Sequence, residues 1–382
     1  MIRFSISNKS LREMEEKHIN NLKGDISVAI AIHKEKYDSD ENYIRLLSYI
    51  EKELSVILCG KISDLKRIIN YIERHFYIAP SKLTKISEGV KYKDAAGNRR
   101  GYLQGYIEQK GLDLHLSETK GSYKYLKNFK EDISELKKVW ESYGEQLSQI
   151  FNYSEFIKFE GEWKAYDLVK HLGVSVCPYC NRQYINTLIK DEKRARAVLD
   201  HFYAKSLYPY LALSLYNLIP CCYFCNSTFK GDKDFYNNES IYPYEEDFSD
   251  CAKFETDFEN QKPYDYKYLL GLSDNFTITI NIDEKRAGED KAKKIARSKQ
   301  VFYLEDMYSF HRDYVKDLIR SIVINDKSRI DEIFKTYEGA FESREEVIQM
   351  LFLNYTEESD FGRRPLSKLT QDIFKELNNV HN

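Results

Sequence analysis

Hydrophobic residues recur at intervals of three and four over most of the chain, which is the pattern of helices that bury one face. In the first third, this pattern predicts a helix from a capping box at 10–13 to about Leu22. Two further helices are predicted over 44–57 and 65–72, and a fourth over 128–151. The chain therefore opens with a mostly helical region.

This first region, residues 1–150, contains no group of residues typical of an active site. We therefore expect it to serve docking or oligomerisation. Small and polar residues over 94–101 interrupt the helical pattern and predict a surface turn.

The middle of the chain mixes short helix and strand patterns. A short helix over 163–172 precedes strand-forming residues over 183–189, a charged turn, and a returning strand over 197–200. The segment 202–218 is predicted to be a loop with one helical turn, and a short helix is expected to begin near Cys222.

In the last third, hydrophobic and polar residues alternate over 275–282, which predicts a half-buried strand. A charged helix over 284–300 follows, and helical patterns continue over 304–322, 328–341 and 343–354 before a last helix. The expected fold class is α+β and predominantly helical. The expected organisation is a helical N-terminal region (1–150), a core (151–250) and a mostly helical C-terminal region (251–382).

Composition narrows the class of protein. The chain has 382 residues, of which 42% are hydrophobic and 31% charged, enough for two or three globular units. Its net charge of -3 excludes a polycation that coats nucleic acid with its whole surface. Basic residues outnumber acidic ones by eight to five over 177–235 and by seven to three over 284–300. Contacts with a nucleic acid backbone are therefore expected only locally.

No apolar run is long enough to span a bilayer, and the first residues lack the pattern of a signal peptide. We therefore expect a cytoplasmic protein that does not enter a membrane. In a reducing compartment, closely spaced cysteines indicate metal binding before disulfides.

Four of the seven cysteines form two Cys-x-x-Cys pairs, Cys177 with Cys180 and Cys222 with Cys225. Two such pairs complete a four-thiolate structural zinc site. Cys221 competes with Cys222 for the role of ligand, but only Cys222 has the two-residue spacing to the last cysteine. The alternatives are unligated buried cysteines and a redox pair.

Between and just after these pairs stand residues suited to hydrolysis of a phosphodiester. Asp200 and Asn226 supply oxygen ligands for one hard divalent cation, Mg²⁺ or Mn²⁺, and His201 is placed to take a proton from water. Asp200 and His201 point to opposite sides if they end a strand. Asn217 either orients the imidazole or fixes the intervening loop.

The segment 177–231 resembles the HNH endonuclease family, whose ββα-metal core carries such framing cysteines in many members. The resemblance implies that Asp200 and Asn226 bind the divalent metal, that His201 is the general base and that Asn217 is the middle asparagine of the motif. The last position of the motif is often histidine in the family and is Asn226 here, which leaves the metal preference open. The family hydrolyses nucleic acid, so DNA is the expected substrate, with RNA as an alternative.

A wider resemblance to larger bacterial HNH proteins rests on Trp163–Leu168, Tyr242–Asp247 and Arg363–Leu369. Some of these proteins are encoded beside an ATPase in Septu-type anti-phage defence pairs, which implies an ATPase partner. Lys205 and Lys230 are candidate phosphate contacts. The competing hypothesis is a non-catalytic zinc module that binds nucleic acid or protein, although such a module has no need of the Asp-His pair and the two asparagines.

Overall fold

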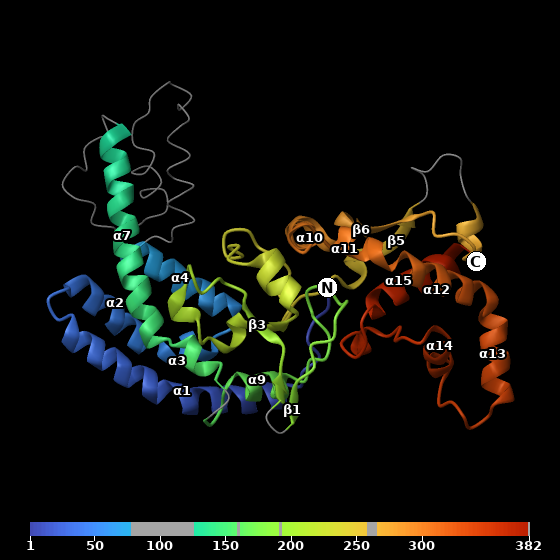
Figure 1. Ribbon diagram of the computed structural model, residues 1–382, viewed down its shortest axis with the longest axis horizontal. Coiled ribbons are helices and arrows are strands. Elements are labelled where there is room, and N and C mark those ends of the chain that lie inside the picture. Colours follow the sequence, from blue (N-terminus) through green and yellow to red (C-terminus); the bar gives the residue numbers. More distant parts are fainter. Residues whose placement is uncertain (78–125, 159–160, 191–192, 258–265, 381–382) are drawn as a thin grey trace.

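The computed structural model describes residues 1–77, 126–158, 161–190, 193–257 and 266–380. In Figure 1 the N-terminal helices lie at one end of the molecule, the C-terminal helices at the other, and the segment with the two cysteine pairs between them. The turn predicted over 94–101 lies outside the described residues. The described part is mostly helical with small antiparallel sheets, which confirms the α+β class.

The N-terminal helices follow the predicted pattern with two differences. α1 spans Asn8–Lys36 and is capped by the Ser7 hydroxyl, so the predicted capping box and the predicted end at Leu22 are wrong. The helix continues because Ile26 and Ile30 extend its buried stripe. The predicted second helix breaks into two at Glu53, and the remaining helices of this region are α2 (Glu41–Lys52), α3 (Leu54–Cys59), α4 (Ile62–His75) and α7 (Leu126–Ile150).

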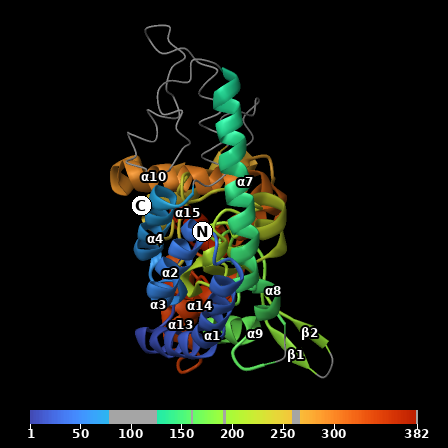
Figure 2. The same ribbon diagram turned by 90° about the vertical axis from the view of Figure 1, so that its left-hand side faces the viewer.

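The central segment pairs its strands differently from the prediction. The strand at 197–200 is found as β3 (Val198–His201), but its antiparallel partner is β4 (Leu218–Cys221) and not the segment 183–189. β3 and β4 are almost wholly buried, so pairing satisfies their backbone groups where water cannot. β1 (Leu188–Lys190) and β2 (Lys193–Ala195) instead form a separate exposed hairpin that projects from the body in Figure 2.

Short helical pieces surround the β3–β4 hairpin. The predicted loop after β3 contains two turns of 3₁₀-helix, and a helical segment with π-type hydrogen bonds follows β4 where the sequence predicts a helix. These pieces are α8 (Tyr153–Phe156), α9 (Ala165–Leu172), η1 (Pro209–Leu211), η2 (Leu215–Asn217) and η3 (Phe224–Lys230).

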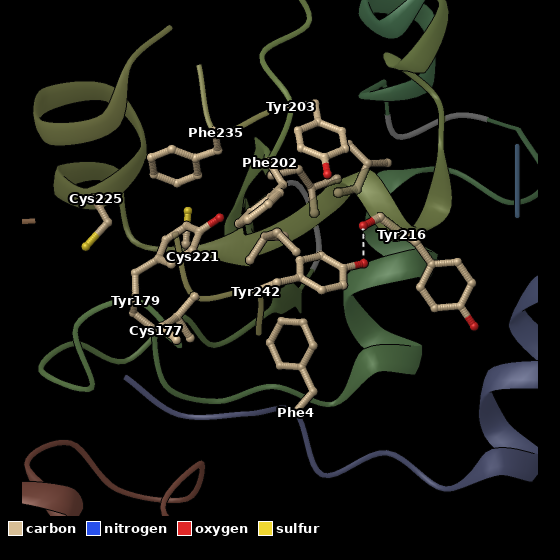
Figure 3. Packing of buried hydrophobic residues seen from close by; sticks show 14 of the residues in the cluster. Phe4, Cys177, Tyr179, Phe202, Tyr203, Tyr216, Cys221, Cys225, Phe235 and Tyr242 are labelled. Atoms are coloured by element: carbon tan, nitrogen blue, oxygen red, sulfur yellow. Dashed lines mark hydrogen bonds between the residues drawn. The ribbon is translucent and has the colours of Figure 1, made fainter. Parts of the chain in front are cut away.

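Aromatic side chains fill the space against the hairpin (Figure 3). The ring of Phe202 packs edge-on against Phe235 and Tyr242, with centroids 5.2 and 4.9 Å apart. The buried Tyr242 hydroxyl donates a 2.6 Å hydrogen bond to the Tyr216 carbonyl in the loop between the strands. The loop is thus attached to the core that also supports the strands.

The C-terminal region packs helices around one further hairpin. β5 (Ala252–Asp257) pairs with β6 (Thr277–Ile282), which confirms the strand predicted over 275–282. The predicted helix over 304–322 is divided by a 3₁₀ turn. The other elements are η4 (Ser249–Cys251), η5 (Tyr266–Leu270), α10 (Glu284–Val301), α11 (Leu304–Tyr308), η6 (Ser309–His311), α12 (Arg312–Ile324), α13 (Lys327–Thr336), α14 (Arg344–Phe352), η7 (Glu358–Asp360) and α15 (Ser367–Val380). Within the described ranges, no helix is both long and apolar enough for a bilayer crossing.

Candidate functional site

The cysteines of the two Cys-x-x-Cys pairs meet in one buried cluster. Their four sulfur atoms all lie within 4.8 Å of one another, and the sulfurs of Cys180 and Cys222 are 3.9 Å apart. A tetrahedral zinc with bonds of about 2.3 Å separates its sulfur ligands by roughly 3.8 Å. The cluster therefore has the dimensions and the donor atoms of a zinc site. It contains Cys222 and not the neighbouring Cys221, as the spacing predicts.

The first cysteine pair sits on a tight turn, residues 176–184, which we call the cysteine turn. The Cys177 amide donates to the Gln183 carbonyl at 3.0 Å, and the Asn181 amide donates to the Cys177 carbonyl at 2.8 Å. Asn181 has a φ of 49°, a left-handed conformation that asparagine adopts more readily than most residues. The turn thereby brings two thiols to one side, facing the second pair.

The electrostatics of the cluster favour a cation. Burial raises the pKa of the Cys177 and Cys225 thiols, because an isolated thiolate loses its hydration there. Hydrogen bonds from the other thiols lower the pKa of Cys222. A zinc ion would compensate the charge of all four thiolates at once.

The second site is built on β3, at the side of the hairpin. Asp200 and His201 are the last two residues of this strand and pair with Ile219 and Leu218 of β4. Their side chains have different neighbours, because successive residues of a strand face opposite sides. Asp200 contacts Tyr179 and Lys230, whereas the His201 ring packs against Tyr153.

His201 is held in one tautomer. Its Nε2 lies 3.0 Å from the Ala212 carbonyl, which can only accept, so Nε2 carries the proton. Burial lowers the pKa of His201 to about 3, so the ring is neutral. Its Nδ1, a proton acceptor in this tautomer, has no hydrogen-bond partner among the described residues. The edge-on contact with Tyr153, with ring centroids 4.5 Å apart, fixes the ring plane.

Asn217 fixes the loop between the strands. Its amide oxygen accepts from the Tyr203 backbone amide at 2.7 Å, and its amide nitrogen donates to the carbonyls of Tyr203 and Leu211. The side chain is completely buried. Of the two roles that the sequence left open, orienting the imidazole or fixing the loop, these contacts correspond to the second. Leu211 precedes Ala212, so the loop in turn positions the carbonyl that orients His201.

Asp200 is engaged by two protein donors. Its Oδ1 accepts from the Lys230 ammonium at 2.9 Å and its Oδ2 from the Tyr179 hydroxyl at 2.6 Å. Lys230 also donates to the His201 carbonyl at 2.7 Å, and its side chain has no exposed surface. Lys230 therefore binds within the protein and does not present its ammonium to a phosphate.

Most of the candidate residues line a single cavity of about 480 Å³. Asp200, His201, Asn226 and Lys205 all contribute to its wall, whereas Asn217 does not line it. Asn226 comes from η3, whose first turn also carries Cys225 of the cysteine cluster. The cysteine cluster thus anchors the helix that brings Asn226 to the cavity.

Two residues that sequence reasoning missed also line this cavity, Tyr153 and Arg196. Tyr153 lies in α8, between the predicted helical region and the motif, and Arg196 precedes β3. Neither stands at a motif spacing. The local excess of basic residues is the only sequence signal that includes Arg196.

The basic helix α10, the other local excess of positive charge, is partly neutralised by neighbouring acids. Lys294 forms ion pairs with Glu239 and Glu246, and Lys299 pairs with Glu305. Its cations are therefore less available to a nucleic acid than their number in the sequence indicates.

Comparison with models of known protein families, with curated proteins and with solved structures found no match to this chain.

Proposed function

We propose that the chain is a metal-dependent endonuclease of the HNH type that hydrolyses phosphodiester bonds of DNA. The observation that carries this proposal is the cavity shared by Asp200, His201 and Asn226. It contains a carboxylate, an imidazole with an unoccupied basic nitrogen and an amide. The antiparallel strands β3 and β4 followed by the helical segment η3 give the order of elements expected for a ββα-metal core.

In this proposal His201 is the general base. Its Nε2–H remains bonded to the Ala212 carbonyl, and its Nδ1 takes a proton from the attacking water in the cavity. The neutral state, which burial favours, is the state that a base requires before the reaction. Asn217 maintains this arrangement by fixing the loop that holds the carbonyl.

The donor set of the cavity suits a hard divalent cation, Mg²⁺ or Mn²⁺. A carboxylate offers about four lone-pair directions, so the bonds from Lys230 and Tyr179 leave Asp200 able to bind a metal as well. Asn226 would supply the second protein oxygen. When bound, such a cation supplies charge relief for the phosphate and the leaving oxygen.

Plasmid nicking with Mg²⁺ or Mn²⁺ tests the proposal. We expect nicking by the wild type and at least 100-fold slower nicking by His201→Ala, about the contribution of a general base. His311→Ala is the matched control, because His311 lies outside the cavity, beside Arg182. Equal nicking by wild type and His201→Ala would exclude the assigned base. RNA of the same sequence, assayed in parallel, identifies the preferred nucleic acid.

A second candidate, a non-catalytic zinc module, is favoured by one observation. Both oxygens of Asp200 already have protein donors, which gives the carboxylate a structural role without any metal. This candidate predicts DNA binding without nicking under all metal conditions, and identical binding by His201→Ala.

We further propose, on the resemblance to Septu-type proteins alone, a role in anti-phage defence with an ATPase partner. The assay is therefore repeated with the product of the neighbouring gene and ATP. Stimulation of nicking by that product supports the partnership, and its absence with an intact complex of the two proteins contradicts it.

A further inference from the structure

We propose that Arg196 and Lys205 together form a binding site for the phosphate backbone of the substrate strand. This inference rests on the proposed nuclease function and assigns Arg196 a role that its place in the sequence does not indicate. Both residues line the cavity that contains His201.

The two cations belong to the wall of one cavity, together with Tyr153 and His201. The Lys205 ammonium lies 4.6 Å from the centroid of the Tyr153 ring, and the His201 ring is 4.5 Å from the same ring. Burial raises the pKa of the Tyr153 hydroxyl to about 12, and the positive charge of Arg196 opposes this rise. Lys205 and the candidate base thus lie against one aromatic side chain, and Arg196 lines the same cavity.

Neither cation has an acidic partner in the part of the chain that the structure describes. Among the described residues, no carboxylate forms a salt bridge with Arg196 or Lys205. Arg196 donates through one terminal nitrogen to the Ala197 carbonyl at 2.7 Å, and its guanidinium lies over the Tyr166 ring at 5.2 Å. These contacts fix the side chain without neutralising its charge.

The charged residues of the cavity wall leave an excess of positive charge. Asp200 is balanced by its ion pair with Lys230, and Asp232, the other acid of the wall, is solvent-exposed. The two positive charges of Arg196 and Lys205 therefore outnumber the single negative charge of Asp232. Arg196 is half-buried and Lys205 is exposed at the rim of the cavity. Two neighbouring cations without counter-ions in the wall of a cavity are a site for an anion, because each can donate a charge-assisted hydrogen bond to it. The anion that the proposed function supplies is a phosphodiester.

Salt dependence of DNA binding tests this site separately from cleavage. The probe is a fluorescent DNA oligonucleotide bound to the inactive His201→Ala protein over a series of KCl concentrations. The slope of log K against log salt is negative, and each lost phosphate contact decreases its magnitude by roughly 0.7 to 0.9. We expect this decrease for Arg196→Met and for Lys205→Met, their sum for the double variant, and no decrease for Arg196→Lys.

Methionine is a long, unbranched side chain without a charge, so it removes the cation and keeps most of the side-chain volume. Zinc content reports whether each variant is folded. The matched control is Lys193→Met, which removes an exposed cation three residues before Arg196 on β2, outside the cavity. If Arg196→Met and Lys193→Met give the same salt slope, the inference is overturned. The proposed function is judged separately, by whether the wild type cleaves DNA and His201→Ala does not.

If the protein neither binds nor cleaves DNA, the proposed function fails and a simpler anion decides on the site. Thermal stabilisation by inorganic pyrophosphate, present in the wild type and absent in the double variant, supports an anion site in the cavity. No stabilisation of the wild type rejects it.

Discussion

At the scale of single residues, the buried pair of Asp200 and Lys230 has the largest energetic consequence. The two side chains are 2% and 0% exposed, and their charged atoms are 2.9 Å apart. Removing one partner of such a pair leaves an uncompensated charge in the interior. We expect Lys230→Met to lower the free energy of unfolding by roughly 3–5 kcal/mol, measured by urea denaturation.

The double variant Asp200→Asn with Lys230→Met is the control for this prediction. It removes both charges, so it should recover much of the stability lost in the single variant. If Lys230→Met unfolds at the same urea concentration as the wild type, the ion pair does not stabilise the protein.

A second residue, His18 of α1, links stability to pH. The Trp163 indole donates to its Nδ1 at 2.9 Å, so its Nε2 carries the proton and donates to the Leu213 carbonyl at 2.7 Å. Burial lowers the pKa of His18 to about 4, whereas an unfolded histidine titrates near 6.5. Between these values the unfolded chain binds more protons, so stability is present above about pH 6.5 and falls as the pH is lowered towards 4.

His18→Gln keeps a donor and an acceptor but does not titrate. We expect the unfolding free energy of the variant to depend less on pH than that of the wild type. The difference in slope is the contribution of one histidine, up to about 1.4 kcal/mol per pH unit. Urea denaturation at about pH 7.5 and about pH 5 measures it. An equal pH slope in wild type and variant contradicts the assignment.

Single residues were predictable where chemistry requires a fixed spacing. The cysteine pairs and the set of Asp200, His201 and Asn226 were identified in this way, and the structure places them in one cluster and one cavity. The partners of these residues were not predictable. Tyr179 bonds Asp200 and Tyr153 packs on His201 from segments whose approach depends on the folded chain.

At the scale of elements, the cysteine cluster connects the hairpin to η3. Cys222 follows β4 directly and Cys225 lies in the first turn of η3, so a zinc ion there restrains both. We expect Cys222→Ser to lose the bound zinc, because it removes one of four ligands. Structural zinc contributes on the order of 10 kcal/mol to folding, so a large loss of thermal stability accompanies the loss of metal.

Cys221→Ala is the matched control for this prediction. Cys221 is buried beside the cluster but contributes no ligand. Metal analysis by mass spectrometry should find one zinc per chain in the wild type and in Cys221→Ala. Zinc retained at full occupancy by Cys222→Ser would contradict the four-cysteine site.

The strand partners show where prediction of elements ends. The pattern of hydrophobic residues located β3 and the helical segment after β4, but it assigned β3 to the segment 183–189. The segment 183–189 was chosen because it is the strand-like segment that directly precedes β3 in the sequence. The actual partner β4 is separated from β3 by a loop of sixteen residues whose closure depends on Asn217, and hydrophobic periodicity contains no information on such closure.

At the scale of the whole molecule, the cysteine turn joins distant parts of the chain. The Ile2 amide donates to the Pro178 carbonyl at 3.0 Å, and the Tyr308 hydroxyl donates to the Cys180 carbonyl at 2.7 Å. Asn181 accepts at its side chain from the Lys368 amide, at the start of α15. Contacts across such sequence distances leave no periodic pattern, so these connections could not be read from the sequence.

These contacts predict how the molecule responds to loss of zinc. Without the cation the buried thiolates would repel one another or take up protons, and the cysteine turn would lose the restraint that holds its backbone carbonyls in place. The segments bonded to the turn should then open more often, while α2, α3 and α4 keep their own core of buried Leu and Ile side chains. Hydrogen exchange with and without a zinc chelator measures this. We expect protection to fall in residues 1–6, 176–184 and 361–369 but to persist in α2, α3 and α4. A uniform loss of protection over all these segments would instead mean that zinc stabilises the chain as a single cooperative unit.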